Sequence, residues 1–284
     1  MVHASRREYI PFIIFQAATI AGVAILFMTL MLLWREGHAV LSWDFVMRPW
    51  SHRDITSGGI AQAIIGSLFV GMGVTLFSFP VGVATAVYLT EYSRETLWKR
   101  VIQLAIQNLA GVPSVVYGLF GLVVFVNTLK FGTTLIAAIL TLSVMTLPWV
   151  ITASVEALTA VPPRFRHSSL ALGATRWQTV WRVVLPSAFP GCITGGIVGI
   201  ARALGETAPI IIVGATFYLS GFPTSPFQKF MALPYHVFIL ATQHSNSSAQ
   251  SYAAATALVL ILMTFCLTLG AIIVRYRLRL KKDW

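Results

Sequence analysis

Arg202 and Glu206 are the only charged side chains in the apolar segment 187–217, where they lie in the run GIARALGETAPIII. A charge at the centre of a bilayer costs about 2.5 to 3.5 kcal/mol, so a protein compensates such a residue or uses it. A planar guanidinium can give a tetrahedral oxyanion two hydrogen bonds and an opposite charge. A nearby carboxylate can accept a hydrogen bond from a protonated substrate oxygen. We therefore predict that Arg202, Glu206 and Thr207 line a path for an oxyanion.

A purely structural role for the pair is the alternative. Residues four apart lie on one face of a helix, so Arg202 and Glu206 can neutralise each other without any ligand. They can also contact a partner subunit. The sequence leaves these possibilities open.

The chain has no other group of residues that is typical of catalysis. It contains no G-x-x-x-x-G-K-[ST] loop to hold nucleotide phosphates, and neither G-x-S-x-G nor H-E-x-x-H. Its two cysteines, Cys192 and Cys266, lie in apolar segments without the spacing of metal ligands. We predict no catalytic residue, no metal and no cofactor, so the chain is not an enzyme. Any ATP that drives its work must be hydrolysed by a partner.

The composition is that of a membrane protein, with 57% hydrophobic and 10% charged residues. A helix needs roughly 20 apolar residues to cross the hydrocarbon. We predict an all-α polytopic membrane bundle with six transmembrane helices, and we expect kinks or interruptions near Pro80, Pro113 and Pro148. The six segments are about 11–34, 60–90, 101–126, 133–155, 187–217 and 252–274.

The basic residues predict the orientation, because cytoplasmic loops are enriched in lysine and arginine. Most of the 20 basic residues lie before the first segment, near 94–100, in 164–182 and after residue 274. This places both termini in the cytoplasm. The net charge of +11 therefore reflects topology, and we expect membrane lipid rather than nucleic acid as the partner.

The cytoplasmic connection 156–186 is longer than the roughly 2 to 8 residues usual between helices, so it must have structure of its own. Pro162 and Pro163 favour the start of a short helix that ends at Gly173. Thr175 and Gln178 form a capping box for an amphipathic helix that Pro186 closes. One interpretation is a basic helix lying on the membrane surface. The other adds a docking knuckle for a soluble partner, made of Ser169, Leu170, Ala171, Leu172, Gly173 and Ala174.

The run from His167 to Pro186 resembles the EAA loop of ABC importer permeases, E-A-A-x3-G-x9-I-x-L-P. Gly173, Leu185 and Pro186 match that pattern, whereas His167 stands at the usual glutamate and Ser168 and Ser169 stand at the usual alanines. The chain also resembles phosphate permeases of the PstA type. The matching stretches are VGVATAVYLTEY, NLAGVPSVVYGLFGL, LALGAT and RALGETAP.

The resemblance implies a type I ABC importer permease core in the bacterial plasma membrane. It also implies three partners: a sister permease of the PstC type, an ATPase dimer of the PstB type, and an extracytoplasmic phosphate-binding protein. The ATPase would bind the knuckle 169–174. Other oxyanions (sulfate, molybdate or phosphonate), an ATP-independent anion carrier and a membrane scaffold remain alternatives. We expect a first helix with an external loop in 1–59, the permease core in 60–275 and a basic tail in 276–284.

Overall fold

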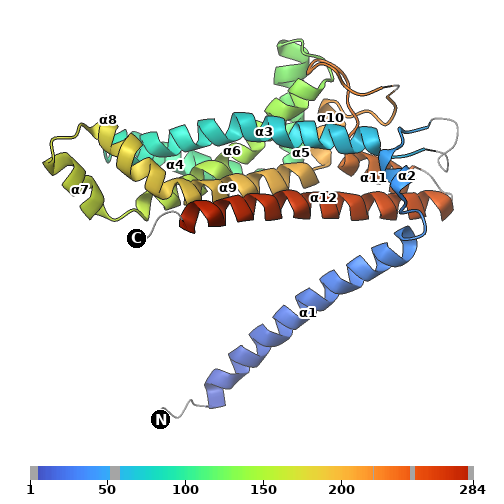
Figure 1. The fold of residues 1–284 in the computed structure, drawn as a ribbon, viewed down its shortest axis with the longest axis horizontal. Helices are drawn as coiled ribbons and strands as arrows, with labels where there is room; N and C mark the ends of the chain where they lie inside the picture. The colour runs from blue at the N-terminus through green and yellow to red at the C-terminus, as the bar shows by residue number, and fades with distance from the viewer. Residues whose placement is uncertain (1–5, 52–57, 220, 244–246, 281–284) are drawn as a thin grey trace.

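The computed structural model describes residues 6–51, 58–219, 221–243 and 247–280, so the predicted basic tail lies partly outside the described residues. The described chain is an elongated bundle of helices (Figure 1). Its longest helices are α1 (Arg6–Gly37), α3 (Ala61–Val87), α6 (Leu135–Thr159), α9 (Leu185–Gly205) and α12 (Ser247–Leu280). The all-α prediction is confirmed for this part of the chain.

Five helical stretches of the described chain are long and apolar enough to cross a membrane. They are Ile14–Gly37, Ala61–Tyr92, Leu135–Thr159, Arg176–Gly205 and Ser248–Arg277. A sixth span exists if the bent pair Leu97–Ala110 and Ser114–Thr128 counts as one crossing. The prediction of six spans is confirmed on that count.

The bent pair consists of α4 (Leu97–Ala110) and a second stretch that begins as α5 (Ser114–Gly121), and it turns by 103°. The turn falls at Gly111 and Pro113. Proline disfavours the helical conformation of the residue before it, so a helix usually ends there. The predicted segment 101–126 is therefore broken in two, and the predicted interruption near Pro113 is confirmed. By contrast, α3 and α6 run on through Pro80 and Pro148.

The predicted segment 187–217 is also not one helix. Helix α9 ends at Gly205, and the short helix α10 covers Ala208–Val213. In a continuous helix the ring of Pro209 would collide with the carbonyl group of Gly205, and its missing N–H would remove a hydrogen bond. The chain instead starts a new helix in which Pro209 occupies the first turn.

Helices α3, α6 and α9 form the centre of the bundle, and small residues let them approach closely. A side chain at Gly82 would collide with Val150, and one at Gly195 would collide with Ala153. The buried cluster around Leu142 and Met145 joins these helices to α5 and α10. This packing holds the last turn of α9 beside α5, α6 and α10.

Helix α1 approaches α12 only at its carboxyl end and lies away from the bundle at its amino-terminal end (Figure 1). Gly37 lies against the backbone of Ala255 in α12, whereas Phe15 and Phe27 of α1 are 71% and 64% exposed. Helix α1 begins, and helix α12 ends, toward the end of the molecule that carries α7 (Pro163–Ala171), in agreement with termini on one side (Figure 1). The short helices α2 (Trp43–Met47) and α11 (Leu233–Thr242) lie near the opposite end (Figure 1).

Candidate functional site

Arg202 lies in the last turn of α9, near the middle of the spanning bundle. One turn earlier, Gly199 is close enough to α6 for an added side chain to contact Thr146 and Val150, which are near the midpoint of Leu135–Thr159. The carboxyl end of a helix carries partial negative charge, so it stabilises a cation in its last turn. The end of α9 thus holds an arginine at mid-membrane depth.

The arginine and the glutamate form an ion pair but not a hydrogen bond. The Nε atom of Arg202 lies 3.4 Å from Oε1 of Glu206, and the two side chains are 37% and 17% exposed. This Nε atom is buried and has no hydrogen-bond partner among the described residues. The pair therefore neutralises charge while leaving hydrogen-bonding capacity on the guanidinium unspent.

The two charges do not share a helix, contrary to the expectation from their spacing. Glu206 follows the end of α9 with extended backbone (φ −77°, ψ 127°), and Thr207 precedes α10. Thr207 is half-buried, and its side chain makes no capping hydrogen bond to α10. The break between α9 and α10 therefore places Glu206 and Thr207 on irregular backbone directly after the helix turn that carries Arg202. Such backbone is tolerated within a membrane where it is buried or lines a cavity.

Two aromatic residues near Arg202 were not singled out from the sequence. The guanidinium carbon lies 5.1 Å from the ring centre of Trp149 in α6, which is within the range of a cation–π contact. Tyr117 in α5 lies in the same buried cluster as Ala203, the residue after Arg202, and its hydroxyl group donates a hydrogen bond of 2.8 Å to the carbonyl oxygen of Leu109. Nothing in the spacing of an apolar run marks either residue, because the contacts join three separate helices.

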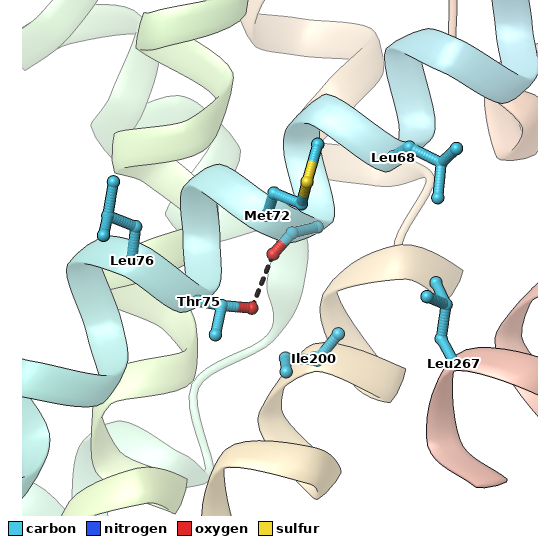
Figure 2. Close-up of a pocket in the computed structure, with 7 residues that line it drawn as sticks. Leu68, Met72, Thr75, Leu76, Ile200 and Leu267 are labelled. Carbon is cyan, nitrogen blue, oxygen red and sulfur yellow. Dashed lines mark hydrogen bonds between the residues drawn. The ribbon is translucent and has the colours of Figure 1, made fainter. Parts of the chain in front are cut away.

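A cavity of about 360 Å³ between α3, α9 and α12 does not suit an anion (Figure 2). Its one polar side chain is Thr75, whose hydroxyl group donates a 2.6 Å hydrogen bond to the carbonyl oxygen of Gly71 (Figure 2). The lining residues are Leu68, Gly71, Met72, Thr75, Leu76, Ile200 and Leu267. An oxyanion would find no free donor side chain there.

The connection that precedes α9 contains the predicted helix and bend. Helix α7 begins at Pro163 and ends at Ala171, and Gly173 follows with φ +82°. Such a left-handed residue after a helix is a common way to end it. The capping box predicted for Thr175 and Gln178 is present, with the side chain of each residue accepting a hydrogen bond from the backbone N–H of the other.

The predicted knuckle is largely exposed, as a docking surface requires. Leu172 is 89% exposed and Leu170 is 42% exposed, and Ala171 and Gly173 are also exposed. Ser169 differs, because its hydroxyl group lies 2.9 Å from that of Thr179, so it ties α7 to α8 (Arg176–Thr179). Ala174 is half-buried.

Pro186 does not close the amphipathic helix, so that prediction is wrong. Helix α8 passes through a π-helical turn, Val180–Val184, and continues into α9 with Pro186 in its first turn. A π-helical turn pairs residues five apart and changes the bonding around a proline that cannot donate. The knuckle is consequently joined directly to the helix that carries Arg202.

An apolar groove of about 560 Å³ lies beside this continuous helix. Trp177 and Trp181, whose ring centres are 5.2 Å apart, form part of its wall. Tryptophan is enriched at membrane interfaces, so these rings also fit the interpretation of a helix at the membrane surface.

Comparisons with known proteins agree with this architecture. Residues 78–281 match the family described as binding-protein-dependent transport system inner membrane component. The chain is 34% identical to the phosphate transport system permease protein PstA 1 of Mycobacterium tuberculosis (strain CDC 1551 / Oshkosh), over 78% of this chain and 71% of that relative. It is 40% identical to the probable ABC transporter permease protein YqgH of Bacillus subtilis (strain 168), over 60% of this chain and 56% of that relative's length.

The fold is similar to that of a bacterial alginate ABC transporter solved in complex with an alginate pentasaccharide-bound periplasmic protein. The TM-score is 0.68 at 17% sequence identity, and the match covers 94% of this chain and 93% of the other. At this identity the likeness concerns the fold alone.

Proposed function

We propose that inorganic phosphate is the substrate of this chain, as it is for the PstA relative by its name. The chain belongs to the family of binding-protein-dependent inner membrane transport components and is a multi-pass permease subunit of an ABC importer. An importer of this class works with a partner ATPase and a substrate-binding protein. We assign these roles to an ATPase dimer of the PstB type and an extracytoplasmic phosphate-binding protein, with a sister permease of the PstC type completing the path.

The observation that carries this proposal is that the guanidinium of Arg202 has a hydrogen-bond donor without a partner in the described chain. This donor is the buried Nε atom of a mid-membrane side chain that is 37% exposed. Phosphate offers paired oxygens and negative charge, which match a guanidinium. Glu206 reduces the net charge beside the anion, so that the path binds phosphate weakly enough to release it.

A sister permease supplies the other wall of the path. The exposed side of Arg202 would otherwise face lipid in a single chain, and a partly exposed charge in hydrocarbon is costly. Placing Arg202 at the interface between two permeases removes that cost and creates a polar route between them.

Uphill import needs energy, because an anion entering an inside-negative cell opposes about 2.3 kcal/mol per charge per 100 mV. In our proposal the ATPase dimer binds the knuckle 169–174, and its two subunits close together when they bind ATP. The continuous helix from Arg176 to Gly205 carries that movement to Arg202. The path then opens alternately to each side of the membrane.

The test is phosphate uptake by vesicles containing both permeases, the ATPase and the binding protein. We expect ATP-dependent uptake that Arg202→Ala abolishes and Arg202→Lys weakens, because lysine keeps the charge but loses the bidentate geometry. Arg48→Ala is the control, since Arg48 pairs with Asp44 on an exposed surface.

Competing oxyanions identify the substrate in the same vesicles. Sulfate, molybdate or a phosphonate that is imported in place of phosphate would overturn the phosphate assignment. Uptake that proceeds without ATP would indicate an anion carrier instead. Normal uptake by Arg202→Ala would remove this residue from the path.

A further inference from the structure

Arg166 connects three elements of the bundle at its α7 end. It belongs to α7, and its Nη1 atom donates a hydrogen bond to the carbonyl oxygen of Val161, just after α6, while its Nη2 atom donates one to that of Leu158 in the last turn of α6. The same side chain reaches Glu91, which lies in the π-helical extension Tyr88–Tyr92 of α3. The Nη2 atom of Arg166 is 2.7 Å from Oε1 of Glu91, and its Nε atom is 3.1 and 3.2 Å from the two carboxylate oxygens.

The surroundings distinguish this ion pair from the other ion pairs of the described chain. The side chain of Glu91 is 10% exposed and that of Arg166 is 22% exposed. The pair between Glu95 and Lys99 joins neighbouring turns near the start of α4, and Glu95 is 88% exposed. Separating an ion pair that is largely withdrawn from water is costly, whereas an exposed ion pair contributes little to stability.

We propose that the Glu91–Arg166 pair is the link through which movement of α7 is transmitted to α3 during the transport cycle. The proposal rests on the proposed role of the knuckle 169–174 as the ATPase contact. Helix α7 is tied to α8 by Ser169 and Thr179, and to α3 and α6 by Arg166. A force on the exposed Leu172 thus reaches α3 through Arg166, and reaches α9 through α8.

The link acts as a positioning element, because neither side chain touches the predicted path at Arg202. Glu91→Gln keeps the shape of the side chain but removes its charge. Arg166 can still donate to Leu158 and Val161, so α7 can still fold against α6. The variant therefore weakens the tie to α3 alone.

The first measurement is the amount of ATP hydrolysed per phosphate imported by the reconstituted complex. We expect Glu91→Gln to raise this ratio by about threefold to tenfold at an unchanged amount of assembled complex. Arg166→Gln should raise the ratio at least as much, and the double variant should add little to either single change. A merely structural role would reduce the number of complexes and leave the ratio per complex unchanged.

Glu95→Gln is the matched control, because it removes a carboxylate with a lysine partner near the same end of the bundle. The hydrogen bond and charge of Lys99 hold the pKa of Glu95 below its ordinary value, so Glu95 is ionised at neutral pH. Glu95→Gln should leave the ratio at the wild-type value.

The second measurement does not depend on the substrate. Spin labels at Arg94→Cys and Arg164→Cys, in a Cys266→Ser background, report the distance between the end of the α3 extension and α7 in the assembled complex. We expect this distance to stay constant on ATP binding in the wild type and to change or broaden in Glu91→Gln. An identical response in both proteins would overturn the link. A wild type that fails to import phosphate would overturn only the proposed substrate.

Discussion

The position of Arg202 is explained by several weak interactions acting together. The end of α9, the carboxylate of Glu206 and the ring of Trp149 each favour the charged guanidinium. None of them satisfies its hydrogen bonds in full. A residue held in this manner can exchange partners with a passing anion at small cost.

Trp149 should therefore affect how well phosphate is held. A cation–π contact is worth about 0.5 to 2 kcal/mol, so Trp149→Leu should raise the half-saturating phosphate concentration of the path by about 2- to 30-fold. Trp149→Phe keeps an aromatic face and should have a smaller effect. The measurement is uptake in reconstituted vesicles at saturating binding protein. Equal values for the leucine and phenylalanine variants would show that the ring contact is irrelevant to transport.

At the scale of the elements, two prolines have opposite effects because of their positions. Pro209 falls where a continuing helix would need its N–H, and α9 ends before it. Pro186 follows a π-helical turn, and the helix continues past it. The result is one continuous element from the knuckle to the predicted path, followed at once by irregular backbone.

The bend at Gly173 should be sensitive to any side chain. Its φ of +82° costs an L-residue about 1 to 2 kcal/mol, although open space surrounds the position. Gly173→Ala should thus weaken co-purification of the ATPase and lower ATP-driven uptake without affecting membrane insertion. Gly270→Ala is the control, because Gly270 also has open space but lies within α12. Full ATPase binding by Gly173→Ala would refute the bend as part of the docking surface.

The whole molecule combines a packed bundle with an apolar helix, α1, that its own chain leaves uncovered. Helix α7, which contains Arg164 and Arg166, lies at one end of the bundle, and α2 and α11 lie near the other (Figure 1). This asymmetry predicts which end faces the cytoplasm.

Thiol labelling tests that orientation in intact cells, again in a Cys266→Ser background. A membrane-impermeant reagent should label Trp43→Cys and Phe227→Cys, whose native side chains are 75% and 60% exposed. Arg164→Cys should react only after the cells are made permeable. The reverse pattern would contradict the assigned topology and move the knuckle away from any cytoplasmic ATPase.

The sequence by itself determined the features that depend on neighbouring residues. Runs of apolar residues predicted the spans, Thr175 and Gln178 predicted the capping box, and Gly173 predicted the end of α7. Short motifs such as RALGETAP predicted the family. These features follow from local rules of hydrophobicity and backbone geometry, which act over a few residues.

Only the tertiary structure decided which residues from distant segments meet. Trp149 reaches Arg202 from α6, and Glu91 reaches Arg166 across a separation of 75 residues. Sequence spacing cannot predict such pairs, because they depend on how close the glycines of α3 and α9 allow these helices to approach α6.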